Sequence, residues 1–291
     1  MKTGNEGSGR SSDDGRAGFK AAAVQMLATS DTEANLQEAA KWVRAAAARG
    51  AELVVLPEVF NWRGSASATF SFAEFIPGPS SSRMAALARD LGVYLLAGSM
   101  LEKVAGADRV FNTSLLLDPG GRLVAKYRKI HLFDVNLDGD VVVSESKFRQ
   151  PGHEPVVAHT RLCPLGLSVC YDLRFPELYR TLSQRGAQVI SVPSVFTVPT
   201  GKAHWEILLR ARAIENQVYV IAPDQIGQHP SSMDAYGHSM IVDPWGKVLA
   251  EAQGSPGIIC ADIDLDYLAA VRKRLPALTH RQEFLDPTRL G

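Results

Sequence analysis

The sequence predicts an α/β protein in which mixed sheets are covered by helices within a single domain. Two observations carry this prediction. Short apolar segments of strand character alternate with amphipathic helical segments along most of the chain. Hairpin signals at 118–121 and 243–246, where Asp-Pro precedes glycine, interrupt this alternation. Alternation favours parallel strands and the hairpins add antiparallel ones, so we expect two packed sheets with outer helices.

Each element is justified by a local pattern. The first helix opens at 30–33, where Ser-Asp-Thr-Glu has the spacing of a capping box, and Gly50 stops it. The other helices that we expect, each with apolar residues at helical spacing, lie at about 81–90, 176–185, 200–216 and 266–274. The expected strands lie at 19–26, 51–56, 93–99, 111–117, 122–126, 156–160, 165–169, 188–193, 218–222, 238–242, 247–250 and 258–263.

Composition narrows the class of protein. The chain has 291 residues and equal numbers of basic and acidic side chains, 31 of each, which argues against a nucleic-acid surface. No apolar run approaches the ~20 residues of a membrane helix, so we expect no membrane partner. The three cysteines are too few and wrongly spaced for a disulfide framework or a zinc finger. Together with the lack of a secretory signal, they predict a cytoplasmic protein.

The expected domain spans residues 19–286. Residues 1–18 consist of glycine, serine and charged side chains with little else, and we expect a disordered N-terminal tail there. Residues 287–291 form a short C-terminal tail. No internal repeat or linker divides the region between them.

The most informative segment is residues 168–179. An apolar run ends at Cys170, a polar turn follows, and Pro176 opens a helix. A cysteine at a strand-to-helix turn is expected to expose its sulfur at the sheet edge, near a helix N-terminus that favours the thiolate. That is where a nucleophile would lie. The alternative is a buried cysteine that merely ends a core strand.

Two further segments supply partners for a nucleophilic thiol. Glu58 ends the apolar strand Leu53–Leu56, at the sheet edge where sites form; alone, it would be a cap or a solvated loop charge. Arg128 and Lys129 follow another strand and point to opposite sides if that strand continues, so that one of them can face inward; alone, they would be a basic strand end in water. Together, Glu58 can serve as the base, and Lys129 can stabilise both the thiolate and an oxyanion. The backbone N–H of Tyr171 would be the second oxyanion donor.

These segments resemble the nitrilase superfamily of carbon–nitrogen hydrolases. The resemblance rests on Leu-Pro-Glu58, Tyr-Arg-Lys129-Ile-His and Cys170-Tyr-Asp-Leu-Arg-Phe-Pro-Glu in this order, and it covers roughly 19–286. It implies a four-layer αββα sandwich and a Glu58–Lys129–Cys170 catalytic triad. It also implies a supporting Glu145 that orients the lysine and the substrate amide, although an exposed loop glutamate is the alternative. No cofactor and no metal are implied. Family members pair through helices near the nucleophile, so we expect a homodimer or larger homo-oligomer.

Other segments resemble the Nit branch of small amidases. They include Phe196 and Thr197, which by analogy line the pocket, and the helical Ala-Arg-Ala-Ile-Glu-Asn at 211–216. The branch implies hydrolysis of a primary amide on a small carboxylate-bearing substrate, deaminated glutathione by the nearer resemblance and α-ketoglutaramate as the alternative. Pro223 and Asp224 depart from the small residues expected there, and an added carboxylate would disfavour an acidic substrate.

Some interpretations stay open. Arg174 either binds a substrate carboxylate or pairs with a nearby acid. A nitrilase or an N-carbamoyl amino acid hydrolase is a rival within the same chemistry. A non-catalytic binding protein on this fold is a rival of another class, because fold does not fix function; an intact triad argues against it.

Overall fold

A computed structural model describes residues 17–137, 141–229 and 232–282. Most of the two predicted tails lies outside these residues. Gly18 already belongs to the first strand, so the domain begins slightly before the expected boundary. No helix in these three ranges combines the length and apolar character needed to cross a membrane.

The first sheet has a parallel centre between antiparallel flanks. Strands β1, β2 and β3 run parallel, β17 pairs antiparallel with β1, and β5 pairs antiparallel with β3. The strands lie in the order β17 (Gly257–Asp264), β1 (Gly18–Gln25), β2 (Leu53–Val55), β3 (Tyr94–Leu96), β5 (Phe111–Leu117) and β4 (Met100–Glu102), with β6 (Leu123–Arg128) also paired to β5.

The second sheet repeats this plan. Strands β10, β11 and β12 are parallel at its centre, while β9 and β15 pair antiparallel at the two sides. The strands lie in the order β16 (Val248–Glu251), β15 (Met240–Val242), β12 (Tyr219–Ala222), β11 (Val189–Ser191), β10 (Pro164–Leu167) and β9 (Val156–His159). Two small hairpins lie apart from the sheets: β7 (Asp134–Leu137) with β8 (Val141–Ser144), and β13 (Ile226–Gly227) with β14 (Ala235–Tyr236).

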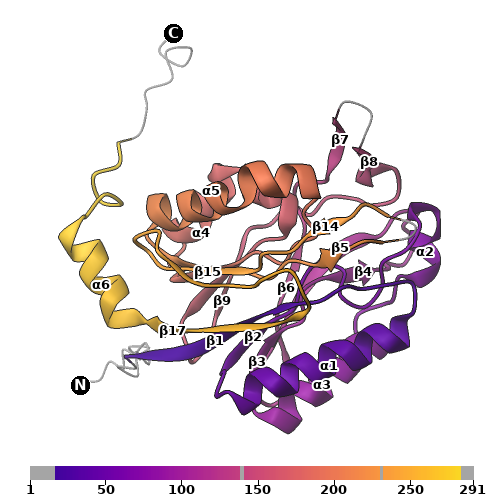
Figure 1. The fold of residues 1–291 in the computed structure, drawn as a ribbon, viewed down its shortest axis with the longest axis horizontal. Coiled ribbons are helices and arrows are strands. Elements are labelled where there is room, and N and C mark those ends of the chain that lie inside the picture. The colour runs from indigo at the N-terminus through magenta and orange to yellow at the C-terminus, as the bar shows by residue number, and fades with distance from the viewer. Residues whose placement is uncertain (1–16, 138–140, 230–231, 283–291) are drawn as a thin grey trace, which may run out of the picture.

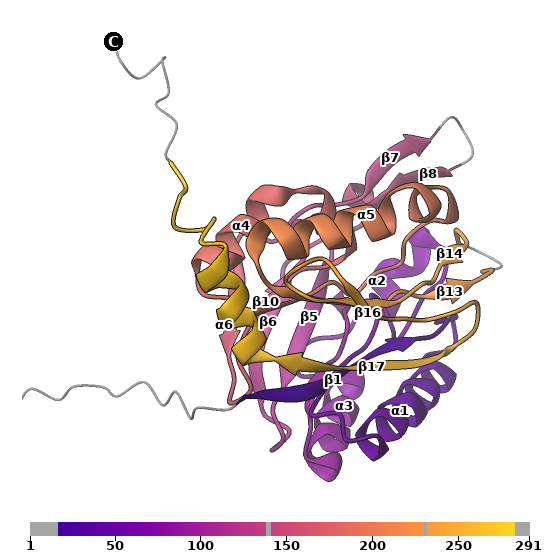
Figure 2. The same cartoon turned by 60° about the vertical axis from the view of Figure 1, so that its left-hand side comes forward.

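Helices cover the outer faces of the two sheets. Helices α1 (Thr32–Ala48) and α3 (Pro79–Leu91) pack on the first sheet, and α4 (Pro176–Gln184) and α5 (Val198–Asn216) pack on the second (Figure 1). The turned view in Figure 2 keeps the same order of layers, with α6 (Leu265–Arg274) continuing β17 at one edge. Short helices α2 (Thr69–Phe72), η1 (Ala66–Ala68), η2 (Glu145–Lys147) and η3 (Cys170–Arg174) lie in the connections. The expected αββα sandwich is confirmed.

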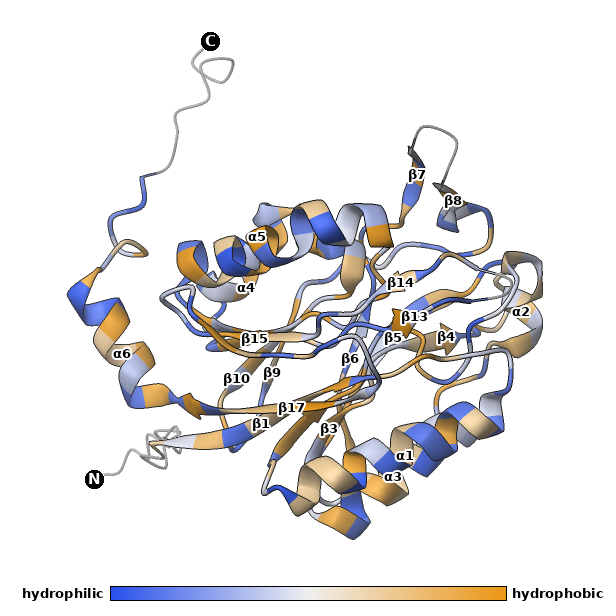
Figure 3. Ribbon diagram, viewed as in Figure 1, coloured by the Kyte–Doolittle hydropathy of each residue, from blue (hydrophilic) through white to orange (hydrophobic). Residues whose placement is uncertain are grey.

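Strand periodicity explains the two cores. Along β1, Ala21 and Ala23 face the second sheet, whereas Ala22 and Val24 face α1 and α3. Small side chains on this central strand let both layers approach closely. Figure 3 shows apolar residues concentrated along the strands and polar residues on the outer turns of the helices.

Most predicted elements are confirmed, with shifted ends. Asp31, rather than Ser30, caps α1, because its carboxylate accepts the N–H of Ala34 at 3.0 Å. Helix α5 begins earlier than predicted, since the Thr197 side chain caps it and Pro199 fits its first turn. Strand β4 and the β7–β8 hairpin were not predicted. Strand β4 has only three residues, too few to show a period.

Candidate active site

The predicted site residues meet where the central parallel strands of both sheets end. Glu58 follows β2, and Cys170 follows β10. Lys129 comes directly after β6, which lies at the edge of the first sheet. Because carboxyl ends of parallel strands share one edge, two sheets packed face to face bring their loops together over one cavity.

Glu58 is buried and fully hydrogen-bonded. Its Oε1 accepts from Lys129 Nζ at 2.9 Å and from Asn112 Nδ2 at 2.8 Å, and its Oε2 accepts from the backbone N–H of Val195 at 3.0 Å. The turn that carries Glu58 passes close to Gly98, where a Cβ atom would lie 1.9 Å from the Pro57 carbonyl. Only glycine fits there, so the loop position depends on it.

Lys129 is 1% exposed and holds two carboxylates together. Its Nζ lies 2.9 Å from Glu58 Oε1 and 3.0 Å from Glu145 Oε2. Burial would lower the pKa of Lys129, but the charges of Glu145 and then Glu58 outweigh it and raise that pKa, so the amine stays protonated. Arg128 points the other way, onto Glu102. The prediction that one of the two cations faces inward is confirmed.

Glu145 lies in η2, directly after the β7–β8 hairpin. Besides Lys129, it pairs with Arg149, and its Oε2 accepts the N–H of Phe133 at 2.9 Å. Burial would raise the pKa of Glu145, but the charges of Lys129 and Arg149 hold it below its usual value. The predicted exposed-loop alternative for Glu145 is therefore wrong, because its side chain is only 10% exposed.

Cys170 begins η3 with a strained backbone at φ +49°. Its Sγ lies 3.7 Å from the Val195 carbonyl, and its N–H donates to the Pro193 carbonyl at 2.9 Å. The predicted exposed sulfur is wrong, since the residue is 7% exposed. Burial, and then the charge of Glu58, raise the pKa of Cys170 well above its usual value, although Lys129 opposes this. Burial therefore favours the protonated thiol over the thiolate, so a base is needed to activate it.

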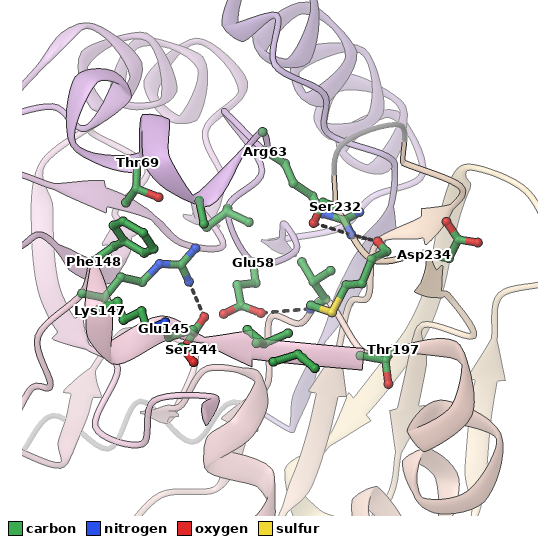
Figure 4. A pocket seen from close by; sticks show the side chains of 18 of the residues that line it. Glu58, Arg63, Thr69, Ser144, Glu145, Lys147, Phe148, Thr197, Ser232 and Asp234 are labelled. Carbon is green, nitrogen blue, oxygen red and sulfur yellow. Dashed lines mark hydrogen bonds and ion pairs between the residues drawn. The ribbon is translucent and has the colours of Figure 1, made fainter. Parts of the chain in front are cut away.

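Two cavities meet beside the thiol. A small one is lined by Cys170 and by the predicted supporting residues Tyr171, Arg174, Phe196 and Thr197. A large one, of about 1020 Å³, is lined by Glu58, Glu145, Arg63, Lys147, Arg149, Ser232 and Asp234 among others (Figure 4). Val195 and Thr197 line both. These two residues therefore form the boundary that the two cavities share.

Besides Glu145, four residues were predicted to support the site. Phe196 packs on Trp205 at a centroid distance of 4.7 Å, and Thr197 caps α5. Tyr171 packs edge-on against Phe133. The Arg174 guanidinium lies over the Tyr171 and Phe196 rings, and its Nη1 is 3.3 Å from Nδ1 of His204. No carboxylate lies at ion-pair distance from Arg174 in the described part of the chain, so the acid-pairing alternative is not found.

One acidic residue beneath the nucleophile was not predicted from the sequence. Asp172 is fully buried and accepts four hydrogen bonds, from Tyr127 Oη at 2.7 Å, Val169 N at 2.8 Å, and His131 N and Nδ1 at 3.0 and 2.7 Å. It ties the Cys170 turn to the segment that carries Lys129. The residue lies inside the motif that identifies the family, but nothing in the sequence indicates its partners.

Asp224 lies beneath the site, fully buried. Its two oxygens accept the N–H groups of Phe196 and Gly237 at 2.9 and 3.1 Å, and it is absent from the described lining of both cavities. No group of three or more His, Cys, Asp or Glu side chains within the described ranges is arranged to hold a metal ion.

Comparison with known proteins assigns the class. The carbon–nitrogen hydrolase family matches residues 20–273, and the chain belongs to that family. It is an amidase of the nitrilase superfamily, a hydrolase of C–N bonds other than peptide bonds.

Relatives from the Nit branch resemble it along nearly its whole length. It is 44% identical to the deaminated glutathione amidase of Synechocystis, over 90% of this chain and 98% of that protein. It is 40% identical to human omega-amidase NIT2, over 92% and 96%. Among solved structures, yeast Nit3, a member of branch 10 of the nitrilase superfamily, superposes with a TM-score of 0.84 at 36% identity, over 92% and 97%.

Proposed function

We propose that this amidase hydrolyses a primary amide of a small carboxylate-bearing substrate to the acid and ammonia. Cys170 is the nucleophile, Glu58 the general base and Lys129 the oxyanion donor. The observation that carries this assignment is the Val195 peptide. Its N–H donates to Glu58 at 3.0 Å and its carbonyl lies 3.7 Å from the Cys170 sulfur. One residue thus holds both base and nucleophile, which fixes their approach.

In the first half-reaction, Glu58 takes the thiol proton as Cys170 Sγ attacks the amide carbon. A C–S bond forms, and the carbonyl oxygen becomes an oxyanion beside the Lys129 ammonium and the Tyr171 N–H. The C–N bond then breaks, the nitrogen takes the proton from Glu58, and ammonia leaves. A thioester remains on Cys170.

In the second half-reaction, Glu58 removes a proton from water, which attacks the thioester carbon. The C–S bond breaks, the acid leaves, and Cys170 recovers its proton from Glu58. Glu145 acts by holding Lys129, since its Oε2 accepts a second hydrogen bond from Nζ beside the one that Glu58 accepts. No step requires a cofactor.

Deaminated glutathione is the proposed substrate, because the Synechocystis relative carries that activity in its name and the sequence resembles that group. The alternative is an ω-amidase that acts on α-ketoglutaramate, in line with the name of the human relative. Nitrile or N-carbamoyl hydrolysis remains a weaker alternative within the same chemistry. We also propose that the protein is cytoplasmic, since its three cysteines are free thiols, which suits a reducing compartment. The resemblance to family members that pair through helices near the nucleophile supports a homodimer or larger homo-oligomer.

Ammonia release from five compounds tests the proposal. They are deaminated glutathione, α-ketoglutaramate, glutamine, a simple nitrile and a carbamoyl amino acid. We expect preferential release from deaminated glutathione and none from Cys170→Ala, which should melt within a few degrees of the parent protein. Unchanged turnover by Cys170→Ala would remove the thiol from the mechanism. Turnover of the nitrile or carbamoyl compound without amide turnover would favour the weaker alternative.

A further inference from the structure

One cation in the wall of the large cavity stands apart from the others. Arg149 is paired with Glu145, and Lys147 is exposed to solvent. Arg63 is only 5% exposed, and no carboxylate lies at ion-pair distance from it among the described residues. Burying an unpaired charge is costly, so such residues usually serve a purpose.

Only one of the two terminal nitrogens of the Arg63 guanidinium, Nη2, makes hydrogen bonds to the described residues. Its Nη2 donates to the Met233 carbonyl and, at 3.4 Å, to Ser232 Oγ. Its Nη1 is buried and has no hydrogen-bond partner in the part of the chain that the structure describes. Figure 4 shows Arg63 and Ser232 on one side of the cavity, Lys147 and Phe148 on the other, and Glu58 between them. Arg63 therefore lines the cavity that also holds the base.

The surrounding charges keep this guanidinium protonated. Burial lowers the pKa of Arg63 to about 10, while the nearby charges of Asp224 and then Glu58 favour the charged form. Taken alone, Asp224 was expected to disfavour acidic substrates. Burial raises the pKa of Asp224 well above its usual value, which weakens that repulsion, and the Asp224 oxygens accept hydrogen bonds from the N–H groups of Phe196 and Gly237.

We infer that Arg63 binds the carboxylate of the substrate and so selects amides that carry an anionic group at their far end. A carboxylate is the natural partner for a half-satisfied guanidinium, because the planar fork matches its two oxygens. Glu58 and Arg63 lie five residues apart on one loop. In this arrangement the substrate amide lies beside Glu58, and the carboxylate at the other end of the same small substrate lies beside Arg63. This inference rests on the proposed function for the position of the amide.

Binding to the Cys170→Ala protein tests the inference without turnover. The probes are glutaramate and its neutral diamide, glutaramide, which differ only in the carboxylate. We expect glutaramate to bind at least about tenfold more tightly, as charge-assisted hydrogen bonds predict. Adding Arg63→Gln should abolish this preference and change glutaramide affinity less than about threefold. Arg63→Lys should retain part of it, since charge remains but the fork is lost. Titration calorimetry measures each affinity, and melting curves verify folding.

Three further variants separate the alternatives. Lys147→Gln removes an exposed cation from the same cavity and should keep the preference. If Arg63 merely neutralises the charge of Asp224, the double variant Arg63→Gln with Asp224→Asn would restore the preference for glutaramate. We expect no restoration. Loss of the preference in Arg174→Gln with retention in Arg63→Gln would overturn the inference, as would equal binding or no binding of the two probes. Failure of the proposed function would instead appear as absent turnover by the Cys170-containing protein.

Discussion

The thiol of Cys170 and the carboxylate of Glu58 oppose each other electrostatically. Each sits against the Val195 peptide, and the charge of Glu58 contributes to the raised pKa of Cys170. The charge on Glu58 therefore disfavours a standing thiolate, although the same residue can remove the proton when substrate is present. A protonated resting thiol also protects the site from adventitious oxidation.

This opposition predicts an unusual phenotype for Glu58→Gln. Hydrolysis should fall by at least about 100-fold, because general base catalysis contributes 10²–10⁴-fold. The pKa of the Cys170 thiol should fall at the same time, since a negative charge that raises it has been removed. The measurement is the pH profile of alkylation by iodoacetamide, followed by mass spectrometry. Cys163, whose pKa burial raises to about 12, is the internal control. An alkylation profile that stays in place or moves to higher pH would contradict this electrostatic picture.

A second prediction at the residue scale concerns Asp172. Asp172→Asn replaces one acceptor oxygen with an NH₂ group that faces donors, so we expect a loss of roughly 1–3 kcal/mol in unfolding free energy. The hydrogen bond from the Val169 N–H to Asp172 positions the turn that carries Cys170, so kcat should fall more than KM rises. Denaturant unfolding and steady-state kinetics measure the two effects. Tyr127→Phe removes only one of the four hydrogen bonds that Asp172 accepts, so it should cause a smaller loss of unfolding free energy and a smaller fall in kcat.

Among the elements, one glutamate joins the three strands at the edge of the first sheet by hydrogen bonds. Glu102 on β4 accepts from Thr113 on β5 and from Lys126 and Arg128 on β6, all at 2.7–2.9 Å. Strand β6 leads directly into Lys129. The cluster thus holds the strand that delivers the lysine, outside the site itself.

This cluster predicts a pH-dependent contribution to stability. Burial would raise the pKa of Glu102, but hydrogen bonds from Arg128, Lys126 and Thr113 lower it from 4.5 to about 2. A depressed carboxyl pKa stabilises the fold above the unfolded-state value and ceases to do so as pH falls through the folded-state value. Glu102→Gln should therefore cost up to roughly 3 kcal/mol at pH 7. The difference from the parent should shrink between about pH 4.5 and 2, measured by urea unfolding. A constant difference across that range would exclude the linkage.

The elements also explain what the sequence could predict. Glu58, Lys129 and Cys170 each follow a strand that is long or apolar enough to recognise, so their convergence at a sheet edge was foreseeable. Arg63 and Asn112 were given no role in the site, because their partners are more than 50 residues away in the chain. The exposure of Cys170 was predicted wrongly, since burial depends on how the second sheet closes over the turn.

At the scale of the whole molecule, the outer surface of the second sheet's helices carries apolar side chains. Ile207 and Ile214 lie seven residues apart on α5, on one face, and are 70% and 49% exposed. Trp245, in the turn between β15 and β16, is 50% exposed. Exposed apolar residues grouped in this way are typical of a surface that another protein covers. Thr197, the N-cap of α5, also lines the small cavity, so pairing through α5 would stabilise one wall of the site.

We therefore predict that the protein self-associates through α5. Light scattering after size exclusion should give at least twice the chain mass of 31.5 kDa, and Ile207→Asp should return the mass to that of one chain. A carboxylate in an apolar interface would lose its water without gaining a partner, which opposes association. Phe75→Asp is the matched control, because Phe75 is 58% exposed but lies between α2 and α3, on the side of the first sheet. It should leave the assembly intact. A single-chain mass for the unmodified protein, or an unchanged assembly in Ile207→Asp, would show that this face stays open to solvent. If turnover by Ile207→Asp also falls while its melting temperature holds, the wall at Thr197 depends on the partner.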